Sequence, residues 1–196
     1  QEIREAHAAS KRTLLDEIAR RTGVQLDPNV MTLGFARRAT PYKRADLIFS
    51  DIDRLTQIAR TVGKIQIVYG GKAHPHDGGG KDLIRRIYSA RERLGDMVKV
   101  VYIENYEMSV AGQMVAGVDL WLNNPLRPLE ASGTSGMKLP PNGGLNLSVL
   151  DGWWCESFNG NNGWAIGSEI KGGTVDFQSE VDASSLYQLL ENQIIP

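Results

Sequence analysis

Apolar residues along this chain follow two spacings, and the two spacings alternate. Short apolar runs rich in β-branched residues predict strands, and they lie at 30–36, 65–69, 98–103, 118–122 and 145–150. Segments with apolar residues three or four positions apart predict helices, and they lie at 2–22, 42–60, 81–94 and 107–116. Weaker patterns predict a short strand at 164–166 and a closing helix at 184–190.

This alternation of strands and helices carries no hairpin signal, so it predicts right-handed βαβ units. The expected fold class is α/β, with a doubly wound, Rossmann-like parallel sheet. In such sheets, ligands bind at the C-terminal ends of the strands. The loops expected at that edge hold most of the unusual polar residues, and they are 37–44, 70–80, 104–106 and 123–138.

Composition narrows the class of protein further. The chain has 196 residues, of which 41% are hydrophobic and 23% charged, as in ordinary globular proteins. A formal net charge of −1 argues against nucleic acid as the main partner. The single cysteine, Cys155, excludes an internal disulfide and fits a reducing compartment. Without a membrane-length apolar run or a signal-peptide core, we expect a cytoplasmic protein with no membrane partner.

The most informative stretch is Glu130-Ala-Ser-Gly-Thr-Ser-Gly-Met-Lys138. Its Ser, Thr and Gly residues at 132–135 predict the start of a helix, where free backbone N–H groups suit a phosphate. Thr134 and Lys138 are four apart, so the Lys138 amine could reach back along that turn. Pyridoxal phosphate carries an aldehyde and a phosphate that could bridge the two points. A solvated surface lysine is the alternative, and it is the commoner one.

Four cations gather after the first predicted strand, around the turn that Pro41 sets: Arg37, Arg38, Lys43 and Arg44. Clustered guanidinium and ammonium groups suit oxyanions. The alternative is a solvated helix start, although the helix dipole disfavours cations there. An anionic partner would resolve that conflict.

Other polar and aromatic groups favour ordinary structural roles. His74 and His76 lack the spacing of a known metal cluster, so we expect no metal site. The aromatic residues at 153, 154 and 158 are more typical of a core or an interface than of a sugar platform. No activating base neighbours Cys155, which we therefore interpret as structural.

Taken together in this order, the motifs resemble those of the α-glucan phosphorylases, which are retaining glycosyltransferases with the GT-B architecture. The motifs are RRATPYKR, GGKAHP, ENYEMS, EASGTSGMK and NLSVLDGWW. The resemblance is close over residues 30–166 and looser at both ends. It implies that residues 1–196 form the cofactor-binding, C-terminal half of a GT-B fold, and that the N-terminal half is absent.

The resemblance also implies roles for individual residues. Lys138 would be the Schiff-base lysine of pyridoxal 5′-phosphate, and together with Arg38 and Lys43 it would make up the catalytic set. The other cofactor-binding residues would be Arg37, Thr134, Ser135 and Tyr106. The substrate-binding residues would be Glu130 on sugar hydroxyls, the backbone at Ser132 and Gly133, and Arg38 and Lys43 on the substrate phosphate.

The implied reaction is reversible phosphorolysis, in which an α-1,4-glucan and inorganic phosphate give glucose 1-phosphate and a shortened glucan. Two features depart from the family. Pro140 and Pro141 should stop the expected helix soon after Lys138. Family members are also several times longer, so the chain is expected to be inactive alone. A sugar-nucleotide-dependent GT-B transferase and a non-catalytic binding fragment stay open, as does a homo-oligomer.

Overall fold

A six-stranded parallel sheet forms the centre of the computed structural model, which describes residues 1–167 and 174–196. The strand order is β3-β2-β1-β4-β5-β6, the order of the Rossmann fold. The strands are β1 (Met31–Ala36), β2 (Ile65–Gly70), β3 (Lys99–Ile103), β4 (Leu120–Asn123), β5 (Leu145–Val149) and β6 (Gly163–Ile166). Every predicted strand is confirmed, and so is the parallel pairing.

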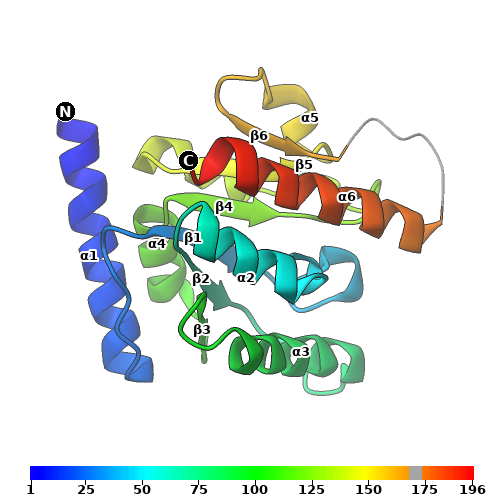
Figure 1. Ribbon diagram of the computed structural model, residues 1–196, viewed down its shortest axis with the longest axis horizontal. Helices are drawn as coiled ribbons and strands as arrows, with labels where there is room; N and C mark the ends of the chain where they lie inside the picture. Colours follow the sequence, from blue (N-terminus) through cyan, green and yellow to red (C-terminus); the bar gives the residue numbers. More distant parts are fainter. Residues whose placement is uncertain (168–173) are drawn as a thin grey trace.

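Helices cover both faces of the sheet, as the doubly wound prediction requires (Figure 1). One face packs against α2 (Ile52–Thr61), α3 (Gly78–Leu94) and α6 (Val175–Leu189), and the other against α1 (Glu2–Thr22) and α4 (Met108–Gly117). Successive strand residues point to opposite faces. Tyr69 and Tyr102 therefore enter the first core, whereas Val68 and Val101 enter the second. Apolar residues on both faces explain why the strands β1 to β4 read as nearly continuous apolar runs, whereas β5 carries Asn146 and Ser148 on one face.

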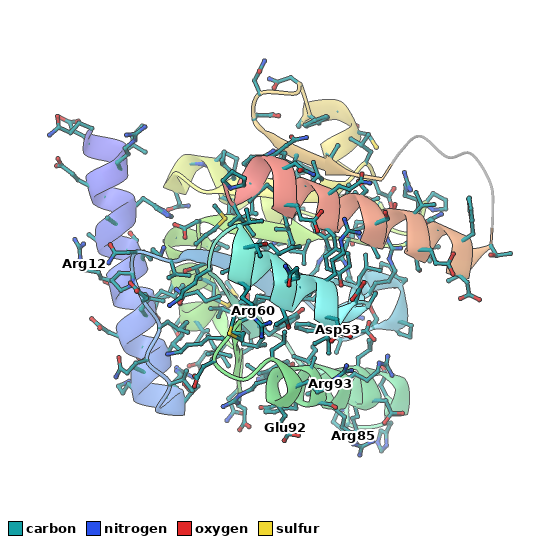
Figure 2. All side chains as sticks on the ribbon, in the orientation of Figure 1. Arg12, Asp53, Arg60, Arg85, Glu92 and Arg93 are labelled. Atoms are coloured by element: carbon teal, nitrogen blue, oxygen red, sulfur yellow. The ribbon has the colours of Figure 1, made fainter. Side chains whose placement is uncertain are left out.

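The N-terminal helix α1 follows the predicted pattern closely. Its buried stripe consists of Lys11, Leu14, Leu15 and Ile18, whereas Arg12 points away from the sheet (Figure 2). Gly23 ends the helix in the left-handed conformation, with φ 72°, and its N–H donates to the carbonyl of Ala19. No helix in the described residues is long and apolar enough to cross a bilayer.

The helix predicted over 42–60 is wrong in its first half. Two 3-10 turns, Pro41–Lys43 and Leu47–Phe49, precede α2, which begins only at Ile52. Arg44 lies between the turns with φ 47°, a left-handed conformation that cannot continue a helix. The side chain of Asp51 accepts the N–H of Arg54 and caps α2. The four cations therefore do not crowd a helix N-terminus.

The α-helix predicted to contain Lys138 is also wrong. Two 3-10 turns, Gly136–Lys138 and Pro140–Asn142, take its place. Two consecutive prolines lack the N–H groups that an α-helix needs, and Gly143 ends the segment with φ 82°. The closing helix, in contrast, is longer than the prediction over 184–190, because Thr174 caps α6 ten residues earlier. A π-helical turn, Leu190–Ile194, follows it, and the one-turn helix α5 (Trp154–Ser157) lies between β5 and β6.

Candidate functional site

The polar residues at the C-terminal edge of the sheet meet where the strand order reverses, between β1 and β4. Arg37 directly follows β1, and Asn123 is the last residue of β4. A terminal nitrogen of Arg37 donates to Oδ1 of Asn123, whose amide nitrogen donates in turn to Oγ of Ser148 at 3.0 Å. Connections leave such a switch point in opposite directions, so a crevice opens there.

Glu130 is the ionic centre of this crevice. Its Oε2 lies 2.8 Å from a terminal nitrogen of Arg37 and 2.7 Å from Nζ of Lys43. All three side chains are nearly buried, with exposed fractions of 5% for Arg37, 12% for Lys43 and 9% for Glu130. Burial lowers the pKa of Arg37, and the Glu130 carboxylate opposes that effect. Two cations thus share one carboxylate in a poorly hydrated place.

A pocket of about 430 Å³ opens beside these charges. It is lined by Arg37, Tyr42, Lys43 and the segment 129–135. Within the residues that the structure describes, the backbone N–H groups of residues 133–135 have no acceptor. Two cations and three residues with free amides line this one pocket, and such a donor set suits an oxyanion such as phosphate.

The loop that carries those amides is held by Asp151 and Trp153, to which the sequence analysis gave no individual role at the site. Asp151 accepts the N–H of Glu130 at 2.9 Å, and the N–H of Trp153 donates to the carbonyl of Ser132 at 2.9 Å. Gly136 packs so closely on Trp153 that an added Cβ would lie 3.2 Å from the indole. Asp151 and Trp153 both lie in the segment NLSVLDGWW, whose resemblance to the phosphorylases was the sequence signal that could have pointed to them.

Lys138 lies just beyond the pocket and is exposed. Its Nζ donates to the carbonyl oxygen of Thr134 at 2.9 Å. The predicted reach of the amine back over the turn is therefore confirmed, although a 3-10 turn and not an α-helix provides it. Leu139 is fully buried beneath, which anchors the chain next to the lysine.

Some of the remaining predicted residues line the pocket, and others do not. Thr134 and Ser135 line it together with Ser132 and Gly133. Arg38 is exposed and does not line it. Tyr106 lies after β3 and packs against Gly70 at the end of β2, where an added Cβ would lie 2.6 Å from its ring. Burial raises the pKa of the Tyr106 phenol.

Arg44 does not belong to the oxyanion site, contrary to the prediction that grouped it with its neighbours. Its left-handed backbone turns the side chain into the protein, where a terminal nitrogen lies 2.6 Å from Asp182 of α6. The same guanidinium donates to the carbonyls of Asn124 and Pro125. Burial lowers the pKa of Arg44, and Asp182 opposes that effect. Its role is therefore to fasten α6 to the strand-end loops.

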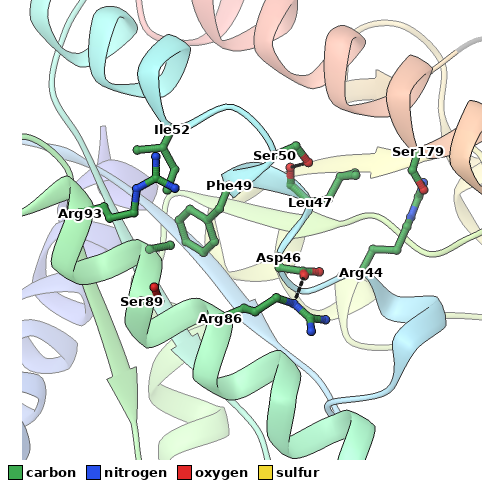
Figure 3. A pocket seen from close by; sticks show the side chains of 11 residues that line it. Arg44, Asp46, Leu47, Phe49, Ser50, Ile52, Arg86, Ser89, Arg93 and Ser179 are labelled. Atoms are coloured by element: carbon green, nitrogen blue, oxygen red, sulfur yellow. Dashed lines mark hydrogen bonds and ion pairs between the residues drawn. The ribbon is translucent and has the colours of Figure 1, made fainter.

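A second pocket, of about 380 Å³, lies between α3 and the segment 44–52 that leads into α2 (Figure 3). Arg86 crosses it to Asp46, with Nε 2.6 Å from Oδ2. Of the cations grouped by the sequence analysis, Arg44 lines this pocket, whereas Arg37, Arg38 and Lys43 do not. Elsewhere Asp77, beside the two histidines, caps α3 by accepting the N–H of Gly80. No group of three or more potential metal ligands occurs in the described part of the chain.

Fold and site together define a class: a Rossmann-like domain with a pocket lined by cationic side chains at its topological switch point and an amine-bearing side chain beside it. The carbohydrate phosphorylase family model matches residues 1–161. The chain belongs to the carbohydrate phosphorylase family.

Three relatives illustrate the likeness. Maltodextrin phosphorylase of Thermococcus litoralis is 47% identical over all of this chain and 25% of its own length. Glycogen phosphorylase of Aquifex aeolicus is 49% identical over 89% of this chain and 25% of its own. Glycogen phosphorylase of Mycobacterium tuberculosis is 47% identical over 87% of this chain and 20% of its own. The chain thus spans a quarter or less of these relatives.

Proposed function

We propose that this chain is the cofactor-binding, C-terminal part of an α-1,4-glucan phosphorylase. The parent enzyme would convert α-1,4-glucan and inorganic phosphate into glucose 1-phosphate and a shortened glucan, in the cytoplasm. The other half of the GT-B fold would close the cleft over the pocket. The observation that carries the proposal is the pairing of Arg37 and Lys43 around Glu130, beside the amides of residues 133–135, which have no acceptor among the described residues.

The donors around the pocket fit pyridoxal 5′-phosphate. Its phosphate would find the Arg37 guanidinium and the backbone amides at Thr134 and Ser135, while Lys138 offers a primary amine within one turn of them. The proposed cofactor-binding residues are Lys138, Arg37, Thr134, Ser135 and Tyr106. When bound, the cofactor would supply its 5′-phosphate as the acid and base partner of the substrate phosphate.

The substrate phosphate would be held by Arg38 and Lys43. Two phosphates side by side repel each other, so the site needs a surplus of cations. Arg37, Arg38 and Lys43 provide three positive charges against the one negative charge of Glu130. The exposed position of Arg38 allows its side chain to turn toward an incoming anion.

Sugar recognition would fall to the other side of the same loop. Glu130 would accept hydrogen bonds from sugar hydroxyls, and the backbone at Ser132 and Gly133 would donate to sugar or phosphate oxygens. Glu130 is held in place by its two cations and by the Asp151 contact to its backbone. A sugar could therefore be oriented without moving the carboxylate far.

The test traps the cofactor on the protein. The chain is incubated with pyridoxal 5′-phosphate, reduced with borohydride and digested, and the modified peptide is identified by mass spectrometry. We expect a pyridoxyl group on Lys138, lost in Lys138→Ala and retained in Lys72→Ala, which removes another exposed lysine from the strand-end loops.

A pyridoxyl group on any other lysine would refute the assignment of Lys138. Absence of modification, with tight binding of a nucleoside-diphosphate sugar, would favour a sugar-nucleotide-dependent transferase. Absence of both would favour a non-catalytic binding fragment. Sedimentation of the same sample reports whether the chain forms a homo-oligomer.

A further inference from the structure

A chain of hydrogen bonds connects the N-terminal helix with the backbone of Lys138. Oδ1 of Asp119 lies 3.0 Å from Nε2 of His7, whose Nδ1 lies 3.1 Å from the carbonyl oxygen of Asn142. The side-chain amide of Asn142 donates to the carbonyl oxygen of Lys138 at 2.7 Å. His7 and Asn142 are 135 residues apart in sequence, so only the fold brings them together.

His7 faces two acceptors, a carboxylate oxygen and a backbone carbonyl oxygen. A neutral imidazole has one N–H and one lone pair, so it can satisfy only one of them. Both contacts are satisfied when each ring nitrogen carries a hydrogen, with the positive charge of the ring balanced by Asp119. The side chain of His7 is only 15% exposed, and its contact with Asp119 is partly buried, whereas its contact with the exposed Asn142 is open to water.

Asp119 is itself fixed to the sheet. Its Oδ2 accepts from Nζ of Lys11 at 2.7 Å and from the backbone N–H of Thr32 at 2.7 Å. Its backbone pairs with Thr32 on one side and Leu145 on the other. The side-chain nitrogens of Lys11 and His7 face this carboxylate, and both residues belong to α1. The position of His7 is therefore set by the central strands.

The turn after Lys138 packs against the face of α1 that carries His7. Gly143 has φ 82°, and a Cβ added to it would lie 3.3 Å from Ile3 and 3.4 Å from Cβ of His7. The turn Pro140–Asn142 thus lies directly on the helix, with little room between them. Because two prolines keep this segment from forming an α-helix, its backbone needs other partners to fix it.

We propose that His7 and Asn142 are positioning residues that set the backbone of Lys138. Asp119 orients His7, His7 holds the carbonyl of Asn142, and the Asn142 amide holds the carbonyl of Lys138. The direction in which the lysine side chain leaves the backbone is then fixed from the sheet. The consequence for the cofactor rests on the proposed function, whereas the hydrogen-bond chain does not.

The test uses two variants that break the chain at different links, His7→Ala and Asn142→Asp. The aspartate keeps the size of the side chain but presents an oxygen to the Lys138 carbonyl. The matched control is Asn192→Asp, because the Asn192 amide also donates to the carbonyl four residues earlier, far from this turn. His74→Ala is the control for loss of a histidine from an exposed loop.

The first readout is amide hydrogen exchange without cofactor. Asn142, Gly143 and Gly144 donate backbone hydrogen bonds within the turn, and we expect their exchange to become about fivefold faster in both variants. The second readout is acetylation of Lys138 by limiting acetic anhydride, followed by peptide mass mapping. We expect a changed rate at Lys138 and an unchanged rate at Lys72.

Unchanged exchange in both variants would overturn the positioning role, and so would equal acceleration in the Asn192→Asp control. If His7→Ala does not fold, Asn142→Asp decides. Borohydride trapping of pyridoxal 5′-phosphate on the same samples separates this proposal from the previous one. If the cofactor is trapped on Lys138 but exchange is unchanged in the two variants, the cofactor site is supported and the positioning role is refuted. If exchange is faster in the two variants but no cofactor is trapped on the unaltered chain, the positioning role is supported and the cofactor site is refuted.

Discussion

Nζ of Lys43 and Oε2 of Glu130 lie 2.7 Å apart, and the same carboxylate oxygen lies 2.8 Å from Arg37. A carboxylate thus stands where two cations could otherwise bind an anion together. The negative charge of Glu130 balances one of the two positive charges, while its hydrogen bonds keep both cationic side chains in place. Such an arrangement holds the cations ready while weakening their attraction for phosphate.

Glu130→Gln should therefore tighten the binding of inorganic phosphate. The amide keeps a hydrogen-bond acceptor for the two cations but removes the competing negative charge. A unit charge about 4 Å away is worth roughly 1 to 4 kcal/mol between water and a protein surface, so we expect about tenfold or more at low ionic strength. Isothermal titration with phosphate measures it.

The matched control for that experiment is Glu156→Gln, which makes the same change of charge at an exposed position outside the pocket. It should leave the phosphate affinity within about twofold, since exposed charges are screened by salt. Equal affinities for the unaltered chain and Glu130→Gln would mean that the carboxylate does not compete with the anion.

Asp182→Ala should strongly destabilise the chain. Asp182 is fully buried, and it pairs with Arg44 at 2.6 Å and with Arg127 at 3.0 Å. Its removal leaves buried guanidinium charge without its carboxylate, a change that typically costs about 3–5 kcal/mol. Urea unfolding followed by circular dichroism measures the loss.

The control for this prediction is Glu191→Ala. Glu191 lies in the π-helical turn that follows α6, and it pairs with Arg54 of α2. Both members of that ion pair are about 30% exposed, at 31% and 29%. Exposed pairs typically contribute less than about 1 kcal/mol. If the two variants lose similar free energy of unfolding, the buried cluster does not fasten α6 in the way described.

The sheet could be predicted from the sequence because most of its strands are short apolar runs, and because the first three crossovers each contain a helical pattern. The same reasoning failed over 42–60, where apolar spacing continued through a left-handed residue, Arg44, that no local pattern reveals. It failed again after Gly136, where the effect of two prolines was expected one turn too late. Local propensity does not report which irregular backbone a tertiary contact will hold.

The site, like the fold, could be predicted only in part from the sequence. Lys138, Arg37 and Lys43 could be named from their motifs, which are contiguous in sequence. The pairing of Glu130 with both cations joins segments almost ninety residues apart, as 87 positions separate Lys43 from Glu130. The contact of His7 with Asp119 spans 112 positions. Such pairs depend on the fold, so a single sequence does not reveal them.

Cys155 should react slowly with alkylating reagents in the folded chain. Cys155 is exposed, and its partial desolvation, with the nearby Asp151 carboxylate, raises the pKa of its thiol above the ordinary value. A raised pKa lowers the fraction of reactive thiolate at a given pH, so the rate should be lower in the folded than in the urea-unfolded chain. Iodoacetamide rates from pH 7 to 10 measure both states. A faster rate in the folded chain would contradict the interpretation of Cys155 as a structural residue.

The 196-residue chain alone should not turn over glucan, although it carries the proposed anion-binding groups. Lys138, Thr134 and Arg38 are exposed, so bound anions would face water. In water a charge pair at about 4 Å gains only about 1 kcal/mol, against several times that in a shielded site. Orientation of the glucan also needs contacts from an opposite wall, and lost positioning can cost several powers of ten in rate.

The assay for this last prediction combines maltoheptaose, phosphate and pyridoxal 5′-phosphate, and it measures the glucose 1-phosphate released. The reference is a full-length relative such as the maltodextrin phosphorylase of Thermococcus litoralis, of which this chain covers 25%. Phosphate titration of the same sample shows whether the anion site is intact, so inactivity is not confused with a misfolded pocket. Turnover within about tenfold of the relative would show that the groups on this one sheet edge supply the positioning themselves, and that no second wall is needed.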